Sequence, residues 1–264
     1  MGNNYDGHYQ VIYIQQVKMH TVTDVAAFTA LLLCQSERSE LIAASGELGP
    51  DPSSKFFTER TKNIAFVLSI NGRWFQINQN YFNQAAYYND FSGGYKRYYR
   101  ELPRTFIECP VAQKLLSRFQ STFDIPQGEL VLVQVQTSHV YPSDETRCLT
   151  GQGIHSDGAD KAMLICLQRH NISGARNALY RDPEGEKPVL KPFVLQEGEV
   201  LFWEDNRVFH SVEPAQVMPP AIAGSRTVLI AHYPAFHYLS GQANPNNQLT
   251  SVADKVVSPV VSSP

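Results

Sequence analysis

His155 and Asp157 are separated by one residue in a short polar stretch between two runs of β-forming residues. In an extended chain, side chains two residues apart point to the same face, so this imidazole and this carboxylate can converge. Two histidines and one carboxylate bind Fe(II) and leave further coordination positions of the ion open. Because a His-x-Asp pair is common by chance and often marks only a strand end or a turn, the interpretation needs a third ligand.

The third candidate ligand is His210, which follows Asp157 by 53 residues within an apolar segment. This separation is expected if several strands lie between the ligands. Zinc is a poorer interpretation, because no cysteine accompanies the histidines and the aspartate. The other histidines have simpler interpretations: His139 and His170 as turn residues, and His232 as a core or edge residue that could also face a cavity.

Arg226 begins the apolar segment 226–231, which is predicted to be a buried strand. An unpaired buried charge is costly, so this guanidinium requires an anion. Its planar set of donors suits a carboxylate, which it can bind through two parallel hydrogen bonds. Arg207, by contrast, is predicted to form a simple ion pair with the nearby Asp205.

Residues 80–100 form an aromatic, asparagine-rich stretch that Gly93 and Gly94 interrupt. One interpretation is an exposed loop tethered by a few aromatic side chains. The other is the wall of a ligand pocket, where rigid aromatic faces and a cation hold a small polar molecule. The sequence favours neither interpretation.

Many short strands must position these residues. Helices are predicted from Thr21 or Thr23 to about Leu41 and over Pro110–Phe123, where a proline begins the helix. Short strands joined by glycine- and proline-rich turns indicate a barrel or jelly roll, so the predicted fold class is mainly β with flanking helices. The predicted strands cover 11–19, 64–70, 74–77, 129–138, 162–167, 177–180, 193–195, 199–203, 208–213 and 226–233.

The composition is that of a soluble globular protein. The 264 residues are 43% hydrophobic and 18% charged, which fits a single domain over 1–240 with a weakly structured tail over 241–264. The net charge of −3 provides no basic surface, so we expect neither nucleic acid nor a membrane as a partner. The sequence shows no recognisable secretion signal. The spacing of the four cysteines matches no known metal-binding or disulfide pattern. Both observations favour a cytoplasmic location.

The sequence resembles Fe(II)/2-oxoglutarate-dependent dioxygenases, and in particular the small family that contains a bacterial isoleucine hydroxylase. The resemblance covers about 80–233, whereas the segment up to Ile70 matches loosely. It rests on the order and spacing of short motifs: Tyr88-Asn89-Asp90 with Gly93-Gly94 and Arg97, Gln134, His155-Ser156-Asp157, Gly174 with Asn177, Phe209 to Pro214, and Arg226 to Leu229.

The resemblance implies a double-stranded β-helix in which His155, Asp157 and His210 hold Fe(II). Arg226 would bind the distal carboxylate of 2-oxoglutarate, whose other end chelates the iron. Dioxygen would be the second cosubstrate, and oxidative decarboxylation of 2-oxoglutarate would accompany hydroxylation of an unactivated C–H bond.

Further residues are candidates for binding small molecules. Gln134 and Asn177 could donate hydrogen bonds to the cosubstrate or substrate, although a satisfied strand amide is the simpler interpretation of each. Relatives carry an arginine two residues after Gln134, and its replacement by Gln136 indicates a different substrate or binding mode. The remaining candidates for the substrate pocket are Arg97 and Tyr99, for a carboxylate, and Tyr88.

The function implied by the resemblance is hydroxylation of a free aliphatic or cyclic L-amino acid, such as isoleucine, leucine, valine or pipecolate. The same cofactors can instead support desaturation or closure of an aziridine ring. An alternative of another class is a β-helix that binds a ligand without catalysis, since a fold alone implies no activity. The complete ligand set with Arg226 argues for the enzyme, and a homodimer is compatible with the sequence.

Overall fold

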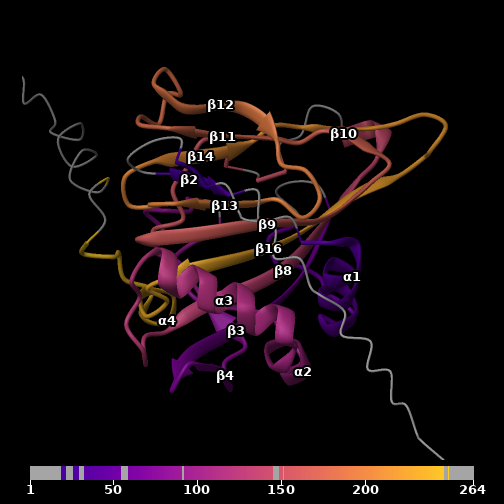
Figure 1. Ribbon diagram of the computed structural model, residues 1–264. Coiled ribbons are helices and arrows are strands. Elements are labelled where there is room, and N and C mark those ends of the chain that lie inside the picture. Colours follow the sequence, from indigo (N-terminus) through magenta and orange to yellow (C-terminus); the bar gives the residue numbers. More distant parts are fainter. Residues whose placement is uncertain are drawn as a thin grey trace, which may run out of the picture.

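The computed structural model describes residues 19–21, 26–29, 33–54, 59–90, 92–144, 149–150, 152–246 and 249, with side chains from Leu33 onward (Figure 1). Two antiparallel β-sheets form the centre, and the first three helices cover the outer face of the larger one, whereas the fourth packs near the cavity on its inner side. The helices are α1 (Gln35–Ala44), α2 (Arg104–Glu108), α3 (Pro110–Thr122) and α4 (His237–Ser240).

The larger sheet has nine strands. All neighbours are antiparallel except β7 (Arg100–Glu101), which runs parallel to β3. The order of the remaining strands is β1 (Met19–Thr21), β2 (Ala26–Thr29), β13 (Val200–Trp203), β9 (Lys161–His170), β16 (Gly224–Tyr233), β8 (Val131–Val140), β3 (Arg60–Ile70) and β4 (Arg73–Ile77).

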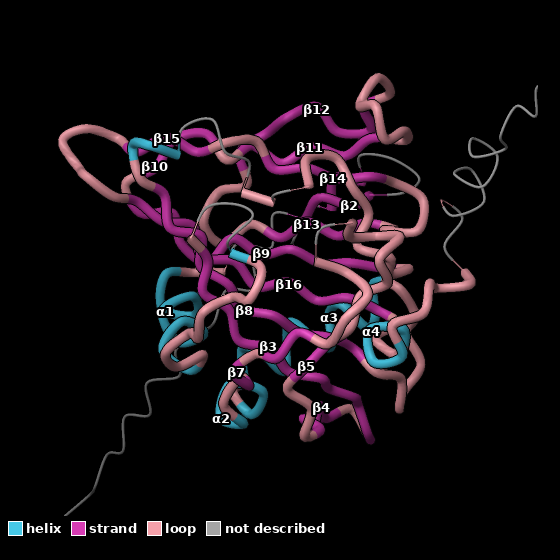
Figure 2. Tube along the Cα trace, turned by 180° about the vertical axis from the view of Figure 1, so that it is seen from behind, coloured by secondary structure: helices cyan, strands magenta, loops and turns pink. Residues whose placement is uncertain are grey.

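The smaller sheet lies over the opposite face of the larger one and consists of β12 (Pro188–Val194), β11 (Arg176–Tyr180) and β14 (Phe209–Val212). A two-stranded ribbon of β10 (Ile172–Gly174) and β15 (Ala215–Val217) projects at the end away from α4 (Figure 2). Another ribbon joins β5 (Tyr81–Phe82) to β6 (Arg97–Tyr98), which brings the two ends of the aromatic stretch together.

Side chains of the central strands point alternately to the two faces of the larger sheet, so the hydrophobic core lies on one face and the candidate site on the other. On β16, Leu229 and Ala231 pack toward the helices, whereas Val228 and Ile230 face the smaller sheet. Because successive residues of a strand point to opposite faces, the same strand presents Arg226 and the other even-numbered residues to the interior between the sheets.

Helix α3 seals the outer face of the larger sheet. Pro110 occupies its first turn, where the missing N–H costs nothing, and the apolar stripe that includes Leu115 and Phe119 is buried. That stripe joins Met163 and Ile165 of β9 in one hydrophobic cluster. Packing of α3 therefore fixes the outer face of the central strands, and their inner face is available for polar residues.

The predicted mainly β architecture with flanking helices is confirmed. The helix predicted from Thr21 or Thr23 to about Leu41 is wrong, because residues 26–29 form β2, which pairs with β13, and the helix begins at Gln35. Pairing with a sheet edge outweighs a weak local helical pattern. The strand predicted at 11–19 lies outside the described residues except for Met19.

The structure adds short elements that the sequence did not predict, among them β10, β15 and α2. Within the predicted weakly structured tail, Asn244 is buried and donates hydrogen bonds to the Gly158 carbonyl (3.1 Å) and to Asp160 Oδ1 (2.8 Å). Among the described helices, none has the length and apolar character needed to cross a membrane.

Candidate metal centre and adjoining cavities

His155, Asp157 and His210 converge between the two sheets. The backbones of His155 and His210 pair in an isolated antiparallel bridge, with N···O distances of 3.0 and 2.7 Å. One ligand atom from each of the three residues lies within 4.8 Å of the others. His155 Nε2 is 3.7 Å from Asp157 Oδ1, and His210 Nε2 is 3.4 Å from Asp157 Oδ2. The arrangement suits an ion with two imidazole and one carboxylate ligand.

Buried Asp205 contacts His210 and the backbone that follows Asp157. Its Oδ1 accepts a hydrogen bond from Trp203 Nε1 (2.9 Å) and lies 3.3 Å from His210 Nδ1. Its Oδ2 accepts from the backbone N–H groups of Gly158 (3.0 Å) and Ala159 (3.2 Å). Although burial opposes the effect, Asp205 and Asp157 raise the pKa of His210. Asp205 therefore orients one histidine and also shapes the loop that carries Asp157.

The predicted pairing of Arg207 with Asp205 is not found. Arg207 Nη1 binds Glu204 Oε2 at 2.6 Å, because these two residues are three apart on one turn. Asp205 points inward instead, where its full burial requires the several donors described above.

His232 is the second residue that supports the centre by contacting a candidate ligand. It faces the cavity, which was one of the two interpretations of its sequence position. Its Nε2 lies 3.0 Å from Asp157 Oδ2, although the approach is oblique for a hydrogen bond. Its Nδ1 is 3.1 Å from Gln134 Nε2, and Gln134 Oε1 accepts from Lys62 Nζ at 3.0 Å.

The direction of this chain follows from Lys62, since an ammonium can only donate. Gln134 must then accept through Oε1 and donate through Nε2, so His232 Nδ1 accepts and His232 Nε2 carries the proton that faces Asp157. Although burial opposes the effect, His232 and the other histidines hold the pKa of Asp157 well below its usual value. Asp157 is therefore a carboxylate with imidazoles on several sides.

A cavity of about 60 Å³ extends from the centre to Arg226. Arg226 is buried on β16, and its Nη2 donates to Asn177 Oδ1 on β11 at 3.1 Å. Arg226 Nε and Asn177 Nδ2 have no hydrogen-bond partner, and no acidic side chain among the described residues pairs with the guanidinium. Burial lowers the pKa of Arg226. Unsatisfied buried donors around a cation fit the carboxylate of a bound dicarboxylic acid.

A second cavity, of about 100 Å³, meets the same centre from the side of the aromatic stretch. Buried Arg97 lines it, donating through Nη1 to Ser53 Oγ (3.2 Å) and Ser92 Oγ (2.9 Å) and through Nη2 to Gln84 Oε1 (3.1 Å). Arg97 Nε has no partner, and no carboxylate among the described side chains pairs with it. Of the two interpretations of residues 80–100, the cavity wall is therefore the one the structure supports.

The other predicted small-molecule residues are distributed as follows. Gln136 lines both cavities, whereas Gln134 lines the larger one and does not belong to the lining around Arg226. Tyr99 lies behind the wall, stacked on Phe82 with ring centroids 4.9 Å apart. Tyr88 is outside both linings and packs against Gly158, where an added Cβ would lie 2.5 Å from its ring.

Lys62 was missed at the sequence level. It lies on β3 just before the predicted strand, and its ammonium is buried against the larger cavity. The signal that identified Arg226, a cation bordering an apolar strand, was also present at Lys62. Asp205 carried no comparable signal, since its partners are brought to it only by folding.

Comparison with known proteins agrees with the geometry. A family model described as 2OG-Fe dioxygenase matches residues 43–232, most of the chain. The chain belongs to the 2OG-Fe dioxygenase family. It is therefore an Fe(II)- and 2-oxoglutarate-dependent oxygenase that uses dioxygen, and its two facing sheets form the predicted double-stranded β-helix. No curated protein matches the chain in sequence.

Solved structures with this fold are distant in sequence. A bsmA homologue from Methylobium petroleophilum PM1 is 20% identical, with 75% of this chain and 80% of that one covered and a TM-score of 0.61. IDO from Bacillus thuringiensis is 15% identical (75% and 82% covered, TM-score 0.56). The Fe(II)/α-ketoglutarate-dependent dioxygenase TqaL is 13% identical (80% and 82% covered, TM-score 0.53). At these identities the similarity shows the fold alone.

The residues of the oxygenase divide the chemistry between them. Bound iron and 2-oxoglutarate supply the oxidising power, and the protein supplies binding, orientation and exclusion of water. Asp205 and His232 restrain the side chains of His210 and Asp157, so the centre needs little rearrangement when it is loaded. Arg226 Nε and Arg97 Nε, each without a hydrogen-bond partner among the described residues, border the two separate cavities that meet at this centre.

Proposed function

We propose that the oxygenase hydroxylates a C–H bond of a small free amino acid. One oxygen atom of dioxygen enters the C–H bond as a hydroxyl group, and the other enters succinate as 2-oxoglutarate loses carbon dioxide. Iron binds His155, Asp157 and His210, and 2-oxoglutarate binds Arg226 with help from Asn177. The aliphatic or cyclic side chain implied by the sequence resemblance stays a prediction.

The observation that carries the proposal is a pair of buried guanidinium groups in two cavities that meet at one centre, each without a carboxylate partner among the side chains that the structure describes. Both cavities reach Asp157 and His210. The Arg226 cavity suits the cosubstrate, which leaves Arg97 to bind a second carboxylate. A free amino acid provides that carboxylate on a molecule small enough for a cavity of about 100 Å³. The resemblance to amino acid hydroxylases supports the same substrate class.

The test is a screen for succinate formation over the proteinogenic amino acids and pipecolate, with Fe(II), ascorbate and 2-oxoglutarate. We expect stimulation by at least one amino acid, and a product that has gained one oxygen atom. A product that has lost two hydrogen atoms would instead indicate desaturation or ring closure. If no free amino acid stimulated succinate formation, the proposal would be wrong. If succinate formation without any substrate were also absent, a binding module without catalysis would be favoured.

The role of Arg97 is tested by Arg97→Met, with Arg100→Met as a matched control. Arg100 is half exposed and pairs with Glu47 at 2.9 Å, outside the cavity lining. Loss of a buried charge-assisted pair costs about 2 to 3 kcal/mol, so Arg97→Met should raise the amino acid concentration for half-maximal turnover by roughly 30- to 150-fold. An equal effect of both variants would mean that Arg97 does not bind the substrate.

A further inference from the structure

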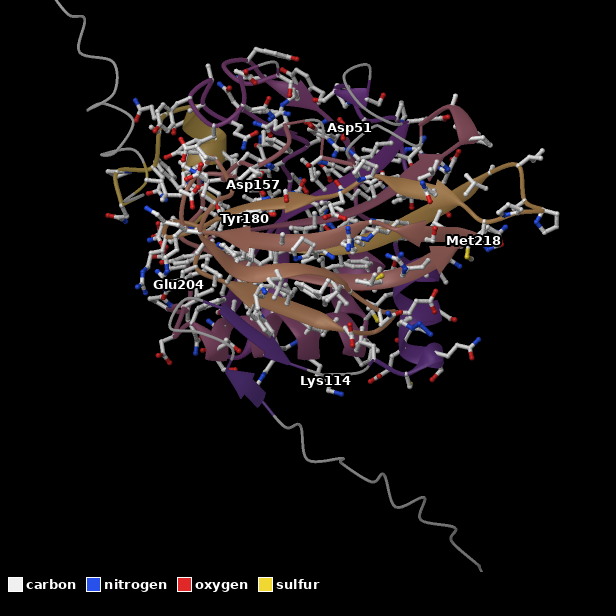
Figure 3. All side chains as sticks on the ribbon, turned by 90° about the horizontal axis from the view of Figure 1, so that it is seen from above. Asp51, Lys114, Asp157, Tyr180, Glu204 and Met218 are labelled. Atoms are coloured by element: carbon white, nitrogen blue, oxygen red, sulfur yellow. The ribbon has the colours of Figure 1, made fainter. Side chains whose placement is uncertain are left out.

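Three cations line the larger cavity, and we call Arg60, Lys62 and Arg97 the cation cluster. Asp51 is the acidic residue that pairs with this cluster, with its Oδ2 2.6 Å from Arg60 Nε and 3.5 Å from Lys62 Nζ. Figure 3 labels Asp51 and the metal-centre residue Asp157. Because Asp157 is a proposed iron ligand, Asp51 is the carboxylate that compensates the charge of Lys62 among the described side chains.

The positive charge of Lys62 is only partly compensated by its neighbours. The closer contact of Asp51 is with Arg60, and the hydrogen-bond acceptor of Lys62 is the neutral Gln134. Burial and the neighbouring Arg60 lower the pKa of Lys62 to about 7. A buried ammonium in this state gains most from an additional anion, because unpaired charge in the interior is costly.

Lys62 and Arg97 lie close enough to bind the two ends of one small molecule. Both lie against the ring of Phe82, with Lys62 Nζ 5.8 Å and Arg97 Cζ 4.5 Å from its centroid. Arg97 retains a free Nε–H, and Lys62 borders the same cavity. The wall of one cavity therefore offers two cations for carboxylates, both near the same aromatic ring.

An aliphatic side chain would fit this wall poorly. Much of the lining is amide or hydroxyl, including Gln136, Thr150 and Gln152. An aliphatic group would remove water from Lys62 without replacing its hydrogen bonds, which costs binding energy. The amide oxygens of Gln136 and Gln152 can instead accept hydrogen bonds from the ammonium group of an amino acid.

We propose that the substrate is an amino acid with an acidic side chain, one of whose carboxylates binds Arg97 and the other Lys62. This inference rests on the proposed function and replaces its predicted aliphatic or cyclic side chain. Glutamate and aspartate are the simplest members of the class, and the C–H bond between the two carboxylates is the one held toward the metal centre.

The experiment compares acids with their uncharged isosteres, using the complete protein with Fe(II) and 2-oxoglutarate. Succinate formation is measured with L-glutamate against L-glutamine, L-aspartate against L-asparagine, and L-leucine and L-isoleucine. We expect at least one acid to stimulate turnover ten times more strongly than its amide and than either aliphatic amino acid. If leucine or isoleucine stimulated turnover and neither acid did, this inference would be overturned while the proposed function stood. If no amino acid stimulated turnover, both would fail.

Lys62→Met tests whether Lys62 selects acidic over uncharged side chains, and Lys114→Met is the control. Lys114 is exposed on α3 and contacts Glu37 at 3.4 Å, away from the cavity. Lys62→Met should reduce the preference for acid over amide at least tenfold, while Lys114→Met should leave it unchanged. Anaerobic calorimetry of substrate binding to the protein loaded with iron and 2-oxoglutarate gives a second readout. Lys62→Gln serves if the methionine variant unfolds, and an undiminished preference in the folded variant would overturn the assignment.

Discussion

His232 Nε2 lies 3.0 Å from Oδ2 of Asp157, so the carboxylate between the two ligand histidines also contacts a third imidazole. His232 is held in turn by Gln134, and Gln134 by Lys62. The three residues come from the adjacent strands β16, β8 and β3, in which Ile230, Gln134 and Ile64 share one register level. The wall of the larger cavity is therefore connected to the metal centre through side chains alone.

Replacing His232 should weaken metal binding. His232→Gln removes the imidazole that faces Asp157, and loss of such a supporting partner typically lowers metal affinity about 10- to 100-fold. Titration of the metal-free protein with Co(II), followed by its absorption spectrum, measures the change. His170→Gln is the control, because His170 is exposed and its ring contacts Asn171 in the turn, away from the cavity linings. Equal affinity of the two variants would show that His232 does not position Asp157.

Asp205→Asn should destabilise both the fold and the centre. The amide cannot accept all the hydrogen bonds that the buried carboxylate takes from Trp203 and from the backbone of Gly158 and Ala159. We expect the free energy of unfolding in urea to fall by about 2 to 4 kcal/mol. Glu204→Gln, which disturbs partly exposed pairs with Lys161 and Arg207, should cost about 1 kcal/mol. A smaller loss for Asp205→Asn than for Glu204→Gln would contradict the structure.

Arg226→Lys should weaken 2-oxoglutarate binding while leaving metal binding intact. Lysine retains the charge but loses the planar pair of donors, so bidentate binding of a carboxylate is lost. We expect the dissociation constant of 2-oxoglutarate, measured anaerobically by calorimetry on the metal-loaded protein, to rise about 10- to 100-fold, as loss of about 1.4 to 2.7 kcal/mol implies. Unchanged 2-oxoglutarate affinity would exclude Arg226 from the cosubstrate site.

Asp51 should stabilise the protein only above acidic pH. Burial raises its pKa, but Lys62 and Arg60 outweigh this and hold the pKa well below the usual value. A carboxylate with a lowered pKa in the folded state contributes stability above its unfolded pKa, near 3.9, and loses it as the pH falls toward the folded pKa. Asp51→Asn should therefore be less stable by about 3 to 5 kcal/mol at pH 7. In unfolding experiments from pH 7 to pH 3, a constant difference between the two proteins would contradict this assignment.

Much of the fold followed from period-two patterns that the chain displays locally. Apart from the short β10 and β15, the strands from β8 to β16 were predicted, most of them to within a few residues, because alternating or continuous apolar runs ended at glycine and proline turns. The N-terminal part was mispredicted, because β2 exists through its pairing with β13 rather than through its own sequence pattern. A short strand that depends on a partner about 170 residues away has little local signal.

By itself, the sequence indicated the three residues that meet at the candidate metal centre and an arginine that folding buries. His155 and Asp157 are two residues apart on an extended segment, and Arg226 heads an apolar strand, so local geometry and the cost of buried charge were sufficient to single them out as candidates. Only the tertiary structure decided what surrounds them. Lys62, Gln134 and His232 lie on three strands, and Asp205 reaches His210 through a turn; these contacts arise from strand register and loop packing, which the sequence does not encode locally.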